Sequence, residues 1–185
     1  MNQIVALVGM CGSGKSVCCE EFRDAGWEYV YFGGVTMQEL EKRGLPRNEQ
    51  NERAVREELR ATYGPAAFAI LLLPQIEEKL KVSNVCLDGL YSWSEWKVLK
   101  EAFGDRLSVV AIVADRKLRY SRIGRRIVRP LTPEQAESRD VAEIENMEKG
   151  GPIAMADVFL MNGNDIDSFR ADTRSLIARA EAGDL

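Results

Sequence analysis

The stretch Gly9-Met10-Cys11-Gly12-Ser13-Gly14-Lys15-Ser16 fits the pattern GxxxxGK(S/T), and it decides the fold expected for this chain. The apolar run 4–8 precedes it and a helical pattern follows it, which is the strand–loop–helix context that a phosphate-binding loop requires. Glycines let such a loop curl so that backbone N–H groups point at phosphate oxygens, and the following helix adds the positive end of its dipole. We therefore predict that the loop binds a nucleoside triphosphate.

Two side chains of the motif carry its chemistry. Lys15 is expected to reach the β- and γ-phosphates, and the Ser16 hydroxyl is expected to ligate Mg²⁺. The predicted cofactor-binding residues are Gly9, Met10, Cys11, Gly12, Ser13, Gly14, Lys15, Ser16 and Val17. Two interpretations of Cys11 stay open: a residue that fills space, or a thiol whose oxidation blocks nucleotide binding.

Length and composition exclude several classes of protein. At 185 residues the chain has the length of one α/β domain, and its net charge of −4 lacks the positive excess typical of nucleic-acid-binding proteins. No apolar run approaches the ~20 residues of a membrane span and no signal segment is visible, so we predict a cytoplasmic protein without membrane contact. The absence of histidine excludes histidine bases and histidine-ligated metals, and the four cysteines lack metal-ligand spacing.

Strand-like and helical stretches alternate along the chain, which favours a parallel sheet with helices on both faces. We expect strands at 3–8, 27–32, 85–87, 107–114 and 158–161. We expect helices at 15–25, 36–43, 49–63, 64–80, 93–103, 115–128, 133–149 and 167–182. The predicted fold is a P-loop NTPase three-layer α/β sandwich with a parallel five-stranded sheet and a small helical lid. It forms a single domain, 1–185, in which 33–81 is the helical acceptor-site region and 116–149 the arginine helix and lid.

Asp88 is the second candidate for metal binding and catalysis. It ends an apolar strand and precedes Gly89, at the sheet edge where parallel strands present ligand sites. A carboxylate there can hold the Mg²⁺ shell opposite Ser16. The alternative interpretation is an ordinary Asp-Gly turn.

A basic segment supplies candidate arginines for phosphoryl transfer. Its members within 116–129 are Arg116, Lys117, Arg119, Arg122, Arg125, Arg126 and Arg129. In a continuous helix Arg119, Arg122 and Arg126 share one face, and arginine offers a migrating phosphoryl group fixed bidentate donors. The segment 131–139, bounded by prolines, is the predicted lid, and Arg139 is the arginine expected on closure. Alternatively, some of these arginines pair with the acidic stretch 134–148.

The region 33–60 should cover a second substrate, by its position in the fold. Its possible contacts Arg43, Arg47 and Arg53 can equally be solvated helix residues. Three aromatic residues after Asp88 can either stack on a base or pack between helices; they are Tyr91, Trp93 and Trp96.

Several further stretches carry a resemblance that spans nearly the whole chain. They are Lys42-Arg43-Gly44-Leu45, Glu58-Leu59-Arg60, Tyr63-Gly64-Pro65-Ala66-Ala67, Ser138-Arg139-Asp140 and the ending Ala156-Asp157-Val158-Phe159-Leu160-Met161-Asn162. With the loop and Asp88, they make the chain similar to the nucleoside-monophosphate kinase group of P-loop proteins, which includes adenylate kinases and dephospho-coenzyme A kinases. The most similar family is adenylate-kinase-like and common in archaea.

The resemblance implies ATP and Mg²⁺ as cofactors and arginines from a lid. The residues that match these roles are Lys15, Ser16, Asp88, Arg122, Arg126 and Arg139. The chain departs from the pattern at Gly34 and Met37, where relatives have an aspartate and an arginine, and at Leu90-Tyr91, where relatives place another arginine. The missing arginines hold an acceptor phosphate in the relatives, so the acceptor site is expected to differ.

We expect an ATP-dependent phosphotransferase acting on a small-molecule acceptor, as a monomer or homodimer that binds no nucleic acid. Two alternatives remain: a slow ATPase that acts as a nucleotide-switched binding or assembly protein, and a dephospho-coenzyme A kinase. The missing acceptor arginines favour the switch, and the lid arginines favour transfer.

Overall fold

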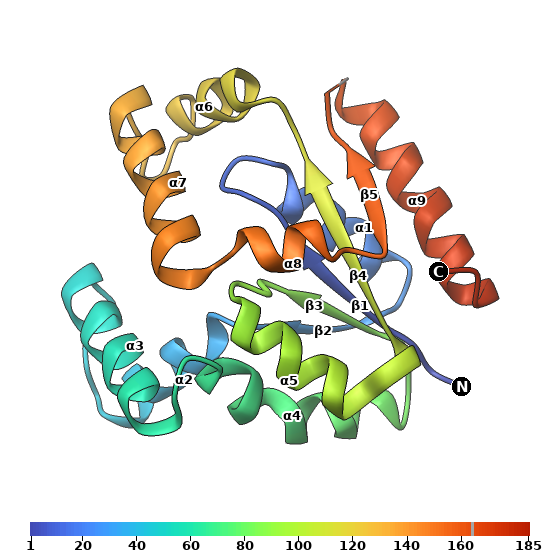
Figure 1. Cartoon of the computed structure of the whole chain (residues 1–185), viewed down its shortest axis with the longest axis horizontal. Coiled ribbons are helices and arrows are strands. Elements are labelled where there is room, and N and C mark those ends of the chain that lie inside the picture. The colour runs from blue at the N-terminus through green and yellow to red at the C-terminus, as the bar shows by residue number, and fades with distance from the viewer. Residues whose placement is uncertain (164) are drawn as a thin grey trace.

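The computed structural model describes residues 1–163 and 165–185 and shows a five-stranded parallel sheet between layers of helices (Figure 1). The strands are β1 (Ile4–Val8), β2 (Glu28–Tyr31), β3 (Val85–Asp88), β4 (Leu107–Val113) and β5 (Val158–Met161). They pair in the order β2-β3-β1-β4-β5, and every pairing is parallel. The predicted α/β sandwich with a parallel five-stranded sheet is confirmed.

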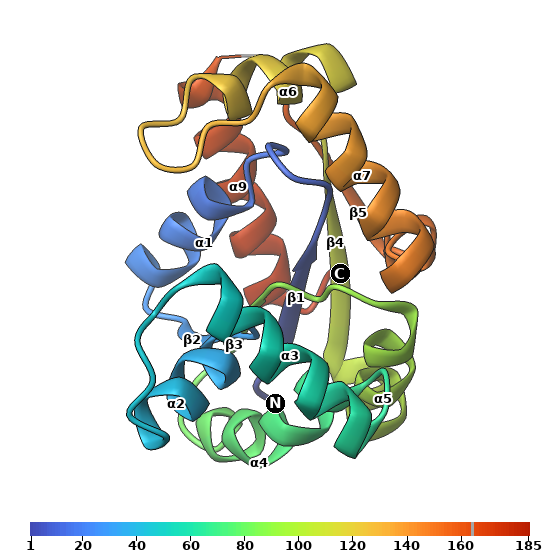
Figure 2. The same cartoon turned by 90° about the vertical axis from the view of Figure 1, so that its left-hand side faces the viewer.

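Helices connect successive strands, as a parallel sheet requires. They are α1 (Lys15–Asp24), α2 (Gly34–Lys42), α3 (Glu49–Tyr63), α4 (Ala67–Leu80), α5 (Trp93–Phe103), α6 (Arg116–Gly124), α7 (Pro133–Met147), α8 (Gly150–Ala154) and α9 (Ile166–Ala182). In Figure 2, α6 lies above the loop that follows β1, α7 runs down beside it, and α2 and α3 lie below it. This loop therefore faces two separate helical regions.

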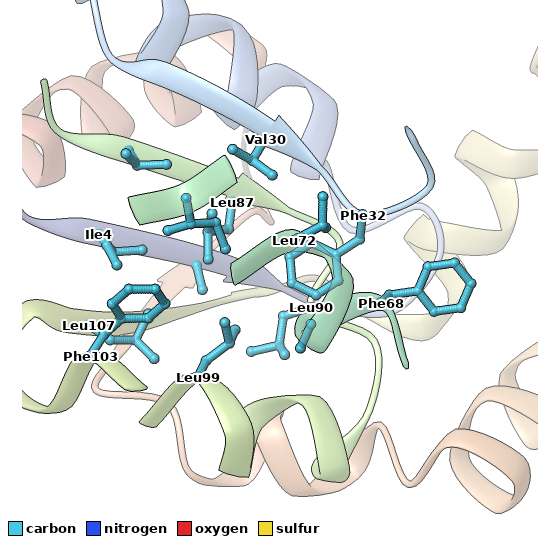
Figure 3. Close-up of a cluster of buried hydrophobic side chains, with 14 of the residues drawn as sticks. Ile4, Val30, Phe32, Phe68, Leu72, Leu87, Leu90, Leu99, Phe103 and Leu107 are labelled. Carbon is cyan, nitrogen blue, oxygen red and sulfur yellow. The ribbon is translucent and has the colours of Figure 1, made fainter. Parts of the chain in front are cut away.

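The core has two halves because successive side chains of a strand point to opposite faces of the sheet. Ile4, Ala6 and Val8 of β1 belong to the apolar cluster beneath α2, α3, α4 and α5, part of which is drawn in Figure 3. Val5 and Leu7 belong to the opposite cluster, with residues of α1 and α9. All five side chains are buried, so β1 is held rigidly where the phosphate loop begins.

The helix in the basic segment is shorter than its sequence pattern predicts. The expected helix 115–128 ends at Gly124, so Arg126 and Arg129 lie in the loop before α7. Glycine weakens a helix interior, and no further turn forms before Pro130. Helix α7 then starts with Pro133 after a Thr132 capping box. The prediction that Arg119, Arg122 and Arg126 share one helical face is therefore wrong, because Arg126 lies beyond the helix.

Candidate functional site

The phosphate loop joins β1 to α1 and is braced from the end of β5. Asn162 is buried, and its side-chain nitrogen donates a hydrogen bond of 2.8 Å to the Ser13 carbonyl. Gly14 has φ +109°, and a Cβ there would lie 2.1 Å from that same nitrogen, so only glycine fits. Within the described residues, no side chain caps the N-terminus of α1. Its first N–H groups are therefore available to an anion.

Lys15 lies inside the loop. Its ammonium donates hydrogen bonds to the carbonyls of Gly9 and, at 3.3 Å, Met10. Burial lowers the pKa of Lys15 to about 8, and repulsion from Lys149 acts in the same direction. Attraction by Glu143 and Asp88 only partly opposes this shift. The chain thus keeps two amines close together in a partly desolvated site, an arrangement suited to an anion.

A cavity of about 280 Å³, here called the phosphate-loop cavity, opens at this loop. It is lined by Cys11, Gly12, Gly14, Lys15, Ser16, Tyr31, Asp88, Tyr91, Arg126, Arg139, Glu143 and Lys149. The structure thus brings together eight of the predicted site residues, which are Cys11, Gly12, Gly14, Lys15, Ser16, Asp88, Arg126 and Arg139. The remaining loop residues support the cavity without lining it. The carbonyls of Gly9 and Met10 accept hydrogen bonds from Lys15, and the Ser13 carbonyl accepts one from Asn162. Val17 packs on the core.

Asp88 reaches the cavity because β3 lies directly beside β1, with Leu7 and Asp88 in register. One of its carboxylate oxygens accepts a hydrogen bond of 2.6 Å from the Tyr29 hydroxyl. Burial, and then this hydrogen bond, raise the pKa of Tyr29, so the phenol stays protonated and keeps donating. Asp88 is therefore fixed in orientation, with its second oxygen not used by this bond.

The predicted arginines divide between the cavity wall and its support. Arg126 lies on the wall and approaches the Cys11 sulfur at 3.5 Å. Arg122 instead donates to the backbone and side-chain oxygens of Asn162, at 3.3 and 3.1 Å. It thereby orients the side chain that braces the loop.

Pairing between the basic helix and the acidic stretch, the alternative interpretation, holds for part of the set. Arg119 makes two hydrogen bonds to Asp140, at 2.6 and 3.1 Å, and both side chains are buried. Its guanidinium also donates to the Cys11 carbonyl at 3.0 Å. Arg116 forms a more exposed pair with Glu137 at 3.5 Å. Arg119 therefore supports the loop rather than lining its cavity.

Two charged residues of the phosphate-loop cavity, Lys149 and Glu143, were not predicted from the sequence. Lys149 is 1% exposed and donates to Glu143 at 2.7 Å, with its ammonium 5.0 Å from the centre of the Tyr91 ring. Glu143 also accepts from Arg139 at 3.2 Å. The sequence held one signal, the i,i+4 spacing of Arg139 and Glu143. Nothing in it distinguished Lys149 from a surface lysine.

A second cavity, of about 460 Å³, lies beside the first and is here called the acceptor cavity, after the role proposed for it below. It is lined by Tyr31, Phe32, Gly33, Thr36, Met37, Glu49, Glu52, Arg56, Arg60, Phe68, Tyr91, Arg129, Arg139, Glu143 and Met147. Four of these residues also line the phosphate-loop cavity: Tyr31, Tyr91, Arg139 and Glu143. The two cavities therefore share a wall.

Of the residues predicted from the sequence to contact a second substrate, only some line this cavity. Arg43 and Arg53 make ion pairs of 2.7 Å with Glu58 and Glu57 and are not among its lining residues. Trp93 and Trp96 stack on each other at 4.6 Å, away from both walls, whereas Tyr91 belongs to both. Within the region 33–60, the arginines that line it are instead Arg56 and Arg60, both on α3.

No family model matches the chain. It is 32% identical over 180 residues to a UPF0200 protein of Pyrococcus abyssi, in an alignment that covers 95% of this chain and 96% of the relative. The chain belongs to the UPF0200 family. A second UPF0200 protein, from Halobacterium salinarum, is 33% identical over 181 residues, with coverage of 95% of this chain and 93% of the relative.

This UPF0200 chain has the fold of P-loop kinases. A shikimate kinase from Bacteroides thetaiotaomicron matches with a TM-score of 0.60 and 13% identity, over 97% of this chain and 98% of that one. A dephospho-CoA kinase from Campylobacter jejuni gives 0.57 and 17%, over 97% of each chain. A gluconokinase from Sinorhizobium meliloti gives 0.59 and 15%, over 98% and 94%. The kinase-group resemblance is confirmed at the level of the fold. Among the described helices, none is long and apolar enough to cross a membrane.

Proposed function

We propose that this chain is an ATP-dependent phosphotransferase that moves the γ-phosphoryl group of ATP to a small-molecule acceptor. The observation that carries the proposal is the acceptor cavity, which adjoins the phosphate-loop cavity through a common wall. Hydrolysis needs no room for a second substrate, and 460 Å³ lies within the usual range of small-molecule sites. The three solved structures compared above are named as kinases, which supports the same reaction class.

On this proposal each cavity residue has a defined task. The loop amides and Lys15 hold the β- and γ-phosphates, and Arg126 and Arg139 neutralise charge on the phosphoryl group as it moves. The bond between the γ-phosphorus and the ADP oxygen breaks, and a bond to the acceptor oxygen forms. Asp88 orients the acceptor hydroxyl and takes its proton. Residues 33–81 supply the acceptor region, and 116–149 supply the arginines and lid.

Magnesium fits the same set of residues. The Ser16 hydroxyl and the Asp88 carboxylate line one cavity, and Tyr29 occupies only one Asp88 oxygen in the hydrogen bonds of the described chain. Oxygen donors with a carboxylate suit Mg²⁺, which retains water and takes phosphate oxygens as its other ligands. When bound there, the ion would supply positive charge to the phosphates.

The decisive test is acceptor-dependent release of ADP. We expect rapid release only with a matching acceptor, screened across nucleoside monophosphates, nucleosides, hydroxy acids and dephospho-coenzyme A. Replacing Arg139 with Ala should lower that rate by about 100-fold, because one donor to the developing charge is lost. Arg125→Ala is the matched control, since Arg125 lies in the same basic segment but lines neither cavity. Its rate should stay within about threefold of the native protein.

Equal ADP release with and without every acceptor would contradict the transferase and support the slow ATPase. Release with dephospho-coenzyme A alone would identify the acceptor and narrow the proposal. Both results are read from the same plate, because ADP is measured in each well against an acceptor-free control.

Nucleotide affinity should fall as the pH rises above about 8. The pKa of Lys15 is lowered to about 8 in the free protein, and bound phosphate restores the charged form. Above that pH, binding must therefore take up a proton, and the affinity for Mg·ADP should drop by up to about tenfold per pH unit. Calorimetric titrations from pH 7 to 9.5 measure this slope. Lys15→Arg should flatten it, because arginine stays protonated; an equal slope in both proteins would contradict the assignment.

A further inference from the structure

In the part of the chain that the structure describes, one guanidinium of the acceptor cavity has no carboxylate partner. Three of its four arginines are neutralised by ion pairs of 2.8 to 3.8 Å: Arg56 and Arg129 with Glu49 and Glu52, and Arg139 with Glu143. Arg60 is the exception. Across residues 1–163 and 165–185, no carboxylate oxygen lies within 4.0 Å of its nitrogens.

Arg60 is held in place although it is unpaired. Its guanidinium lies 5.0 Å from the centre of the Phe68 ring, which is itself part of the cavity wall. Burial lowers the pKa of Arg60, and the attraction of Glu95 opposes this only in part. A partly desolvated cation without a counter-charge gains free energy when an anion arrives.

Thr36 gives a second, independent indication of a polar ligand. It lines the same cavity from α2 and is 1% exposed. Its hydroxyl oxygen has no hydrogen-bond partner in the described part of the chain. Buried hydroxyl groups normally have one, because leaving them unpaired costs free energy.

We propose, building on the transferase function above, that the acceptor is a hydroxyl compound carrying an oxyanion, which Arg60 binds, while Thr36 makes a hydrogen bond to the same molecule. The planar guanidinium matches a carboxylate and a phosphate monoester equally well. With its anionic end on α3, the acceptor extends its hydroxyl towards the shared wall of Tyr31 and Tyr91 and so towards Asp88.

The test measures anion binding without requiring transfer. The donor site is first filled with Mg·AMP-PNP, which excludes phosphate from the loop. Inorganic phosphate and acetate are then titrated separately, and the arginine side-chain N–H resonances are followed by NMR. We expect the Arg60 signal to move and at least one anion to bind; the stronger of the two tells whether a phosphate ester or a carboxylate is preferred. Arg60→Gln should weaken that binding at least tenfold.

Arg53→Gln is the matched control. Arg53 lies on the same helix, is paired with Glu57 and lines neither cavity, so its loss should change anion affinity by less than about threefold. Arg60→Lys keeps the charge without the planar donors and serves if Arg60→Gln does not fold; it should weaken binding about three- to tenfold. Thr36→Val should leave the affinities for inorganic phosphate and acetate unchanged. It should weaken the binding of the acceptor that supports ADP release in the screen above.

Failure of this inference is distinct from failure of the transferase proposal. If AMP-PNP does not bind, the assignment of the phosphate loop as the donor site is wrong, and so is the inference about Arg60 that rests on it. If AMP-PNP binds but neither anion moves the Arg60 signal, or both arginine substitutions have equal effects, the oxyanion is excluded and the transferase still stands.

Discussion

Lys15→Met is expected to weaken Mg·ATP binding by about 100-fold and to abolish transfer, while leaving the protein at least as stable as before. The loss follows from removing the one cation that lies inside the phosphate loop. The stability follows from the pKa, because an amine whose pKa is lowered to about 8 is held in its charged form at a cost in the folded state. Methionine fills similar space and ends the repulsion by Lys149. Calorimetric binding and urea unfolding measure the two effects on one sample.

Lys117→Met is the control for this experiment, because Lys117 is exposed on α6 and lines neither cavity. It should change neither nucleotide binding nor stability by more than about 0.5 kcal/mol. A Lys15→Met protein that binds ATP as tightly as the native chain would overturn the assignment of the loop. A protein that loses binding and also unfolds more readily would show that Lys15 is structural.

Asp140→Ala should destabilise the fold by about 3–5 kcal/mol, because it leaves the buried Arg119 guanidinium without its carboxylate. The side chains of this pair are 8% and 10% exposed, and two hydrogen bonds join them. Arg119 also donates to the Cys11 carbonyl, so the phosphate loop should loosen together with the pair. Urea unfolding measures the stability, and Mg·ADP affinity reports on the loop.

The neighbouring pair Arg116 and Glu137 provides the comparison. Its side chains are 68% and 61% exposed, so Glu137→Ala should cost less than about 1 kcal/mol. The double replacement Arg119→Met with Asp140→Leu removes both charges and should recover much of the stability that Asp140→Ala loses. Equal costs for Asp140→Ala and Glu137→Ala would show that burial of the inner pair is unimportant.

The fold could be predicted because its signals are local. The apolar run 4–8, the glycine-rich loop and the regular alternation of strands and helices each depend on neighbouring residues. The error in the basic segment came from treating charge as a helical pattern. Arginines are good helix formers, but Gly124 and Pro130 end the helix, and Arg126 therefore reaches the cavity from a loop.

The acceptor cavity could be placed in the chain but not described in chemical terms. Arg56 and Arg60 look alike on the printed sequence, four residues apart in one amphipathic helix. They differ because Glu49 and Glu52 reach Arg56 but not Arg60, which lies against Phe68 from another helix. Lys149 could not be recognised for the same reason, since its burial and its contacts with Glu143 and the Tyr91 ring form only in the folded chain.

A slow Glu143 variant would be easy to mistake for an enzyme that has lost its general base. A carboxylate on the wall of an active site is readily taken for the general base. A slow alanine variant at this position would be taken to support that assignment. Although burial acts against it, attraction by Lys149 and Arg139 holds the pKa of Glu143 below its ordinary value, which makes it a weak proton acceptor. Its removal would release two cations into the site at once. A slow Glu143 variant would therefore measure misplaced positive charge, and only a shift in the pH–rate profile would identify a lost base.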